Sequence, residues 1–196
     1  MNTGIQSESS EWMVQDIHVK RMEQSDIGGL YDGHEIAVHG LTHANPVGHD
    51  EAWLEEEYGR DIENITRIYG RRPVGMAYAY GAYDDAACAW LCGHGIKYGR
   101  TVDASKSFDL PEDLIRLRPS CHHNDAELFP MLERFLNETP PEGESRLFYV
   151  WGHSYEFDAV RNWARIEEFC ARASGREDVF YGTNTECLEY LGLLKV

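Results

Sequence analysis

The sequence has little that would suit a membrane protein or a nucleic-acid-binding protein. No apolar run approaches the roughly 18 residues that a membrane-spanning helix needs, and the longest strongly apolar stretch runs only from Leu147 to Trp151. Basic residues are scarce, because 18 lysines and arginines stand against 34 acidic residues and leave a net charge of −16. Such a surface repels phosphate backbones and anionic lipids. We therefore expect no nucleic-acid partner and no membrane partner.

Secretion and disulfide signals are missing as well. The first residues contain no basic region followed by an apolar one, so we find no secretory signal. The five cysteines are odd in number and form no CxxC pair, which favours reduced thiols. These features indicate a cytoplasmic protein. The remaining composition, with 42% hydrophobic and 12% aromatic residues, is globular and fits a single domain over residues 1–196.

Strand-like runs alternate with helical patterns along the chain. Alternating or continuous apolar residues predict extended segments over residues 35–39, 74–80, 96–102, 147–153 and 178–184. Apolar residues at spacings of three and four, with suitable caps, predict helices over residues 50–70, 84–93, 127–136, 162–175 and 183–194. This alternation is typical of an α/β fold with a mainly parallel sheet or barrel.

Unusual polar residues follow several of these predicted strands. His39 and His43 follow the first, Tyr80 follows the second, and His153 ends the apolar run at residues 147–153. Ligands of α/β folds collect at the carboxyl ends of the strands. We therefore expect these side chains to contribute to one site.

The pair His39 and His43 has a spacing that permits metal binding. Histidines four residues apart can hold one ion when they lie on a tight loop, and Gly40 and Thr42 favour such a turn. The alternative is a structural pair, since nine histidines in one chain produce close pairs by chance. No convincing acidic third ligand precedes the pair, because Asp32 should lie at the opposite end of the strand.

Four motifs in order resemble the polysaccharide deacetylase superfamily, carbohydrate esterase family four. They are "GHEIAVHGLTHANP", "RRPVGMAYAYGAYDD", "RLRPSCHHND" and "LFYVWGHSYEFD", and the similarity runs from about Tyr31 to the C-terminus. The resemblance implies a distorted (β/α) barrel. It also implies hydrolysis of N- or O-acetyl groups from carbohydrate with one divalent metal ion, commonly zinc, with cobalt or nickel as alternatives.

The resemblance also assigns residue roles. His39 and His43 match the family's H-[ST]-x-x-H metal motif, with Gly40 where a hydroxyl residue often stands. His153 matches the general acid that protonates the departing amine or alcohol, and Asp158 is a candidate to orient it. The expected substrate-binding residues are Arg72, Tyr78, Tyr80, His123 and Trp151.

One family feature has no counterpart here. The family opens with a strand ending in an Asp-Asp motif, which supplies the general base and the third metal ligand. No such motif precedes His39, so we expect the first strand, the first helix and most of the second strand to be absent and metal binding to be weak. We also expect sheet edges near residues 1–6 and 36–39, covered by the N-terminal segment or by a second copy of the chain.

Two other functions stay open at this point. The same site residues could serve a hydrolase of small amides or ureides, in which only the pocket would differ. Alternatively, the missing Asp-Asp motif favours a catalytically inactive protein that binds carbohydrate or a partner.

Overall fold

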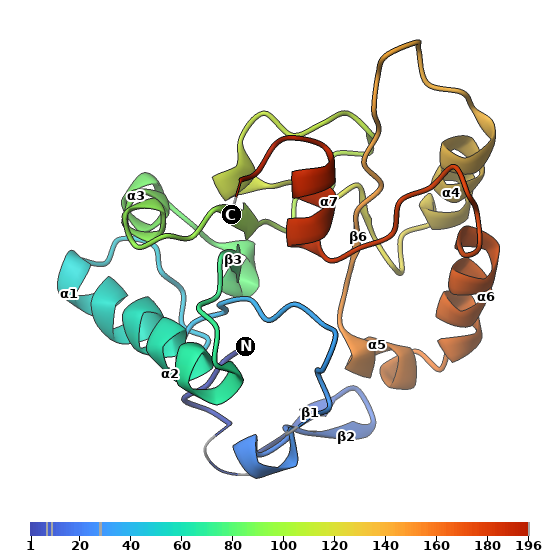
Figure 1. Ribbon diagram of the computed structural model, residues 1–196. Helices are drawn as coiled ribbons and strands as arrows, with labels where there is room; N and C mark the ends of the chain where they lie inside the picture. The colour runs from blue at the N-terminus through green and yellow to red at the C-terminus, as the bar shows by residue number, and fades with distance from the viewer. Residues whose placement is uncertain (7, 9, 28, 196) are drawn as a thin grey trace.

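Short parallel strands and peripheral helices form a mixed α/β structure. The computed structural model describes residues 1–6, 8, 10–27 and 29–195. Its strands are β1 (Glu11–Val14), β2 (Ile17–Lys20), β3 (Gly75–Ala77), β4 (Tyr98–Arg100), β5 (Cys121–His122) and β6 (Val150–Trp151). Its helices are α1 (Glu51–Leu54), α2 (Arg60–Tyr69), α3 (Asp85–Gly93), α4 (Leu128–Asn137), α5 (Ser154–Ala159), α6 (Trp163–Ala173) and α7 (Asn184–Tyr190). Helices α1 to α3 lie on one side of the short strands and α4 and α6 on the other (Figure 1).

The parallel strands form a run of neighbours in space. β3 pairs with β4 and β5 pairs with β6, both in parallel. Single parallel bridges extend the run, joining Val38 to Met76 and Arg100 to Leu117. The predicted α/β class is therefore confirmed. The expected barrel is not shown, because within the described ranges the sheets are two-stranded and the parallel strands are only two or three residues long.

The five predicted helices are present, and most of their ends lie within about two residues of the predicted ones. The exception is α7, which ends at Tyr190 and not at residue 194. The predicted helix at 50–70 begins after Asp50, whose side chain accepts a hydrogen bond from Trp53 N, and ends at Gly70, with φ of 69°. A π-helical segment, Glu55–Gly59, interrupts it between α1 and α2. Helix α7 has the predicted capping box between Thr183 and Glu186.

The predicted strands are less accurate than the helices. Residues 35–39 contribute one bridge, at Val38, and the run at 147–153 contains only the two residues of β6, both half-buried. The strand predicted at 178–184 is wrong. Its aromatic residues contact other helices instead, since Phe180 stacks on Tyr190 at 4.3 Å between ring centroids and the Tyr181 hydroxyl donates to the carbonyl oxygen of Ala173 at 2.5 Å.

The N-terminal segment lies along residues 37–41. The Asn2 side-chain amide donates to the carbonyl oxygen of His39 at 2.6 Å, and Gly4 N donates to that of Leu41 at 2.9 Å. Thr3 is buried and donates through its backbone and its hydroxyl to Asp61. The edge that we expected near residues 36–39 is thus covered by residues 1–4.

The main hydrophobic core lies between α2, α3 and β3. Tyr58, Ile62 and Ile65 from the predicted helix pack against Met76 and Leu91, and each is at most 1% exposed. This core fixes the start of β3 and the loop after Val38, which carries His39 and His43. None of the helices in the described ranges has the length and apolar character needed to span a bilayer.

Candidate functional site

His39 lies directly after the bridge between Val38 and Met76. Its ring Nδ1 lies 2.5 Å from the carbonyl oxygen of Ala77, and its backbone N donates to Oδ2 of Asp61 at 3.1 Å. Because a carbonyl can only accept, Nδ1 carries the proton and Nε2 keeps a free lone pair. Burial and, to a smaller extent, the positive charge of the N-terminal amine lower the pKa of His39 to about 3. The ring is therefore neutral at pH 7, the form in which histidine ligates metals.

His43 faces His39 across the tight turn that the sequence predicts. The two ring centroids are 4.8 Å apart with an interplanar angle of 77°. Gly40 has φ of 85° and His43 has φ of 63°, so both residues use the left-handed region to turn the chain back. Burial lowers the pKa of His43, and the charge of Arg21 contributes in the same direction.

Glu57 holds this turn in place, which the sequence does not reveal. Its carboxylate accepts hydrogen bonds from Thr42 N at 2.9 Å, from the Thr42 hydroxyl at 2.8 Å and from Ala44 N at 3.2 Å. Glu57 is only 5% exposed and belongs to the π-helical segment. Thr42, which we expected to favour the turn, does so by bonding this buried carboxylate.

His153 caps α5 and is paired with an acid on that helix. Its Nδ1 lies 3.2 Å from Oε1 of Glu156, one helical turn away. Asp158, our candidate to orient His153, instead accepts a hydrogen bond from Trp163 Nε1 at 2.7 Å. That expectation is wrong, because five residues of separation place Asp158 away from His153, whereas a separation of three places Glu156 beside it.

Glu156 also joins two adjacent histidines to His153. Its Oε2 lies 3.0 Å from Nε2 of His122 and 2.5 Å from Nε2 of His123. His122 Nδ1 accepts a hydrogen bond from Asn124 N at 3.1 Å, so the neutral His122 ring carries its proton on Nε2, the atom that faces Glu156. Burial alone would raise the pKa of Glu156, but hydrogen bonds from His153 and His123 and the charge of His122 together lower it.

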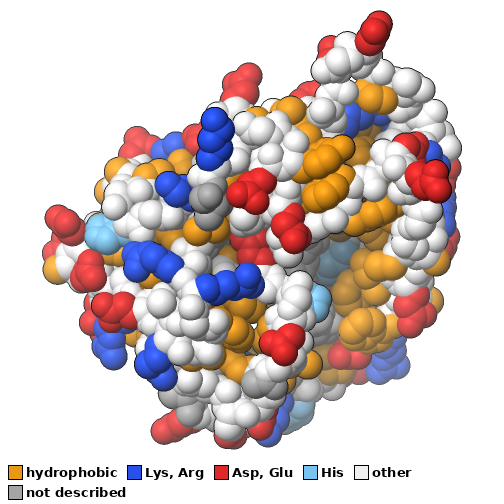
Figure 2. Space-filling model, in the orientation of Figure 1, with side chains coloured by type: hydrophobic (Ala, Val, Ile, Leu, Met, Phe, Trp, Pro, Cys, Tyr) orange, Lys and Arg blue, Asp and Glu red, His pale blue; other side chains and the backbone are white. Residues whose placement is uncertain are grey.

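His153 links these two groups of histidines. The charge of His153 lowers the pKa of His43 and also that of His122, so His153 lies within electrostatic reach of both. Figure 2 shows a hollow in the region of β6 and α5 with histidine side chains inside it. Among the described residues, the one group of three side chains able to share a metal ion is His122, His123 and Glu156. No described carboxylate or thiol completes such a group with His39 and His43.

Two of the expected substrate-binding residues contact this histidine site. Tyr80 follows β3, is 69% exposed and meets the ring of His43 at 4.5 Å between centroids. Trp151 ends β6 and lies edge-to-face with His122 at 4.7 Å and with His153 at 5.7 Å. Both offer the exposed or half-exposed aromatic surface that sugar rings pack against.

The other three expected substrate-binding residues are not exposed beside the histidines. His123 is only 3% exposed and binds Glu156. Tyr78 is 1% exposed, and its hydroxyl donates to the carbonyl oxygen of Ile115 at 2.8 Å, which makes it a core residue. Arg72 precedes β3, at the end of the strand opposite to Tyr80, and donates to the carbonyl oxygen of His94 at 2.8 Å. Tyr78 directly follows β3 and points into the core on the same side as Met76, which the sequence motif alone did not show.

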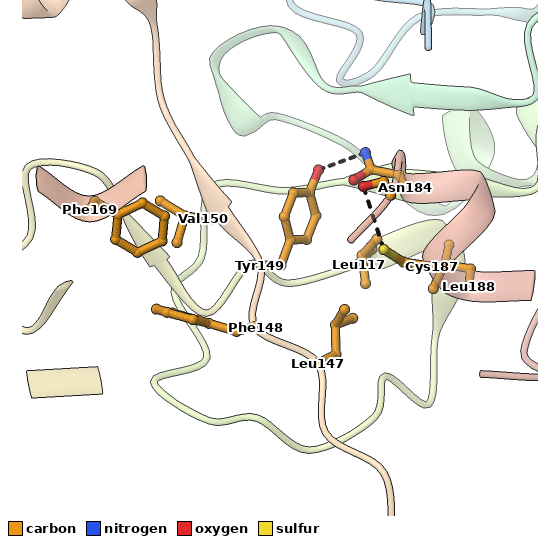
Figure 3. A pocket seen from close by; sticks show the side chains of 10 residues that line it. Leu117, Leu147, Phe148, Tyr149, Val150, Phe169, Asn184, Cys187 and Leu188 are labelled. Atoms are coloured by element: carbon orange, nitrogen blue, oxygen red, sulfur yellow. Dashed lines mark hydrogen bonds between the residues drawn. The ribbon is translucent and has the colours of Figure 1, made fainter. Parts of the chain in front are cut away.

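A separate pocket lies between β6 and α7 (Figure 3). Its walls are mainly apolar and include Leu117, Phe148 and Leu188, and the Tyr149 hydroxyl accepts a hydrogen bond from the Asn184 side-chain amide at 3.0 Å. No histidine or carboxylate lines it. The pocket therefore differs in its chemistry from the histidine site.

Comparisons with known proteins agree with the resemblance described above. Residues 12–99 match the family model of polysaccharide deacetylases. A peptidoglycan deacetylase of Helicobacter pylori is 27% identical over 70 residues, which are 36% of this chain and 24% of that protein. The chain thus spans about a quarter of the length of this curated relative.

Two solved structures are similar to parts of the chain. A polysaccharide deacetylase from Bacillus cereus is 21% identical, with a TM-score of 0.42, over 53% of this chain and 33% of that one. A Streptococcus pyogenes deacetylase, solved in complex with acetate, is 14% identical, with a TM-score of 0.43, over 53% of this chain and 42% of that one. The family match begins earlier than the expected Tyr31 and includes His39 and His43 but not His153.

Proposed function

From the polysaccharide deacetylase match over residues 12–99, we propose that this chain carries the site of a metal-dependent hydrolase that removes N- or O-acetyl groups from carbohydrate. The observation that supports the proposal most strongly is the ring contact between His39 and His43, with His153 within electrostatic reach of His43. The segment that carries His39 and His43 is more than 100 positions away from His153 in the sequence. The fold therefore brings distant parts of the chain together here.

The two imidazoles fit a divalent metal ion, with zinc as the first choice and cobalt or nickel as alternatives. His39 donates Nδ1–H to the Ala77 carbonyl, which is the outer contact that orients most metal-ligating histidines. A zinc ion bound by His39 and His43 would polarise the acetyl carbonyl and acidify a water molecule. Because no described carboxylate joins the pair, we expect weaker binding than at a site with three protein ligands.

His153 would supply a proton to the departing nitrogen or oxygen. Glu156 accepts from Nδ1, which leaves Nε2 as the ring atom available to a substrate in the hollow. A positioned general acid typically contributes about 10²–10⁴ in rate. Tyr80 and Trp151 offer aromatic surfaces beside the His43 and His153 rings for the sugar.

Acetate release tests this function. The purified chain is incubated with zinc and either an N-acetylated oligosaccharide or a small amide or ureide, and His153→Ala serves as the inactive control. Acetate released from the oligosaccharide by the wild type but not by the variant supports the proposal. Turnover confined to the small amide or ureide would assign the chain to the rival hydrolase, and equal turnover by His153→Ala would remove the role of His153.

A second candidate function is carbohydrate binding without turnover. One observation favours it, namely that no described carboxylate completes a group of three possible metal ligands with His39 and His43. The nearby carboxylates of Asp61 and Glu57 accept backbone hydrogen bonds instead. Oligosaccharide binding by calorimetry, with no acetate released at any zinc concentration, would support this candidate over the hydrolase.

A further inference from the structure

Side chains from three parts of the chain form a continuous series of ring contacts that passes through His153. We call this series the arc. Arg21 stacks on Trp12 at 4.3 Å, and Trp12 meets Tyr155 at 5.6 Å. Tyr155 stacks on His153 at 5.1 Å. On the other side of His153, Trp151 follows at 5.7 Å, and the guanidinium of Arg100 lies 4.6 Å from its ring centroid. The arc therefore has an arginine at each end and the proposed proton donor in its middle.

Neither arginine has an acidic partner among the described residues. Arg21 donates to the Ser10 hydroxyl at 3.1 Å. Arg100 makes one long contact, 3.5 Å, to the carbonyl oxygen of Thr101. Arg100 is half-buried, and burial lowers its pKa. A buried charge without a counter-ion is costly, and this one persists in a chain whose net charge is −16.

The position of Arg100 is that of a ligand-binding residue. It is the last residue of β4, and ligands of parallel α/β sheets bind at the carboxyl ends of the strands. Its guanidinium lies against the ring of Trp151, and Trp151 in turn contacts His153. The cation therefore lies two ring contacts from the proposed proton donor.

A second polar group on the arc is unpartnered. Trp151 Nε1 is buried and has no acceptor among the described residues. An indole N–H can only donate. The Trp151–Arg100 pair thus presents a buried hydrogen-bond donor and a half-buried cation with no protein anion, a combination that an anionic ligand would satisfy.

We propose that Arg100, supported by Arg21, binds a carboxylate carried by the substrate, so that the substrate class is an acylated amine or sugar bearing a carboxylate group. This inference rests on the proposed function, because it names the bound molecule as the substrate. The binding itself does not require turnover. Arginine matches a carboxylate through two parallel N–H donors, and stacking on Trp151 holds its plane. The carboxylate belongs either to the sugar or to the acyl group, and the choice of probe separates the two sources.

Binding of matched probes tests the inference by calorimetry on the full chain. N-acetylmuramic acid differs from N-acetylglucosamine by one lactyl carboxylate on the sugar. N-succinylglucosamine differs from N-acetylglucosamine by a carboxylate on the acyl group. We expect at least one of the two carboxylated probes to bind about 10-fold tighter than N-acetylglucosamine, and the one that does identifies the source of the charge.

Arginine variants assign the effect to the arc. Arg100→Gln should reduce the preference to less than about 2-fold, Arg21→Gln should reduce it in part, and Arg100→Lys should restore some of it. Arg71→Gln is the control, because Arg71 is exposed and binds the His34 carbonyl oxygen. If circular dichroism shows that Arg100→Gln is unfolded, the binding preference of Arg21→Gln becomes the deciding measurement.

Two results would overturn the inference. One is a wild type that binds neither carboxylated probe more tightly than N-acetylglucosamine. The other is a preference that survives both glutamine substitutions. A preference without acetate release would contradict only the proposed hydrolase, whereas acetate release without a preference would contradict only this inference.

Discussion

Oε1 of Glu156 lies 3.2 Å from Nδ1 of His153, while Oε2 of the same carboxylate lies 3.0 Å from Nε2 of His122. One side chain on α5 therefore joins the strand end at β5 to the strand end at β6. The position of His153 in the hollow depends on this carboxylate, because the backbone alone fixes only its Cα.

Replacing Glu156 by glutamine should destabilise the protein. The amide cannot accept from several imidazoles as a carboxylate does, and a buried donor left without its partner costs about 1–3 kcal/mol. Urea unfolding of Glu156→Gln against wild type measures this loss. Glu167→Gln, on the exposed side of α6, should change the free energy of unfolding by less than about 0.5 kcal/mol. If Glu156→Gln and Glu167→Gln have equal free energies of unfolding, the Glu156 carboxylate does not stabilise the fold.

The stabilisation by Glu156 should depend on pH in a defined direction. Its pKa in the folded protein is below the usual value of 4.5. Its contribution is therefore present above about pH 4.5 and is lost as the pH falls through the lower native pKa. The difference in unfolding free energy between wild type and Glu156→Gln should persist at pH 5 and shrink toward pH 3. A difference that grows over that interval would contradict the assignment.

Gly152 is required by its neighbour His123. A Cβ at position 152 would lie 1.7 Å from Cδ2 of His123, far inside contact distance, and His123 is buried with little room to move. Gly152→Ala should therefore cost about 1–3 kcal/mol through overpacking, measured by thermal or urea unfolding. Gly93→Ala is the control, because no atom lies within 4 Å of a Cβ there. A Gly152→Ala variant as stable as Gly93→Ala would mean that His123 is not held beneath the strand end.

Asp84 ties helix α3 to the loop that follows His43. Its carboxylate accepts from Ala87 N and from Gly48 N, each at 2.8 Å. Asp84→Ala removes the N-cap and the loop contact and should cost about 1–2 kcal/mol. Asp84→Asn keeps a capping oxygen and should lose less. Hydrogen exchange at the Gly48 amide measures the effect on the loop separately from the effect on the helix. If this amide is as well protected in Asp84→Ala as in the wild type, Asp84 does not hold the loop.

The sequence predicted the histidine pair and its turn but not the acids that support the site. The four-residue spacing of His39 and His43 and the presence of Gly40 were sufficient to predict the turn, because the turn depends on local geometry. Glu57 reaches Thr42 from 15 residues away and Glu156 reaches His123 from 33 residues away. Such contacts depend on how helices pack beside strand ends, which periodicity does not encode.

The fold shows the same division between local and long-range information. The helix over 50–70 was predictable from its cap at Asp50 and its end at Gly70. The strand expected at 178–184 was wrong, because Phe180 and Tyr181 find helix partners and stay half-exposed. Aromatic residues at strand spacing predict pairing only when a neighbouring edge is available.

Zinc titration by calorimetry tests the central claim most directly. We expect the wild-type chain to bind about one equivalent and both His39→Asn and His43→Asn to weaken binding at least about 10-fold. His49→Asn, a substitution of an exposed histidine near the same loop, should leave the affinity unchanged. Zinc binding that survives in His39→Asn and His43→Asn but is lost in His122→Asn would place the metal on the other histidine group and contradict the account.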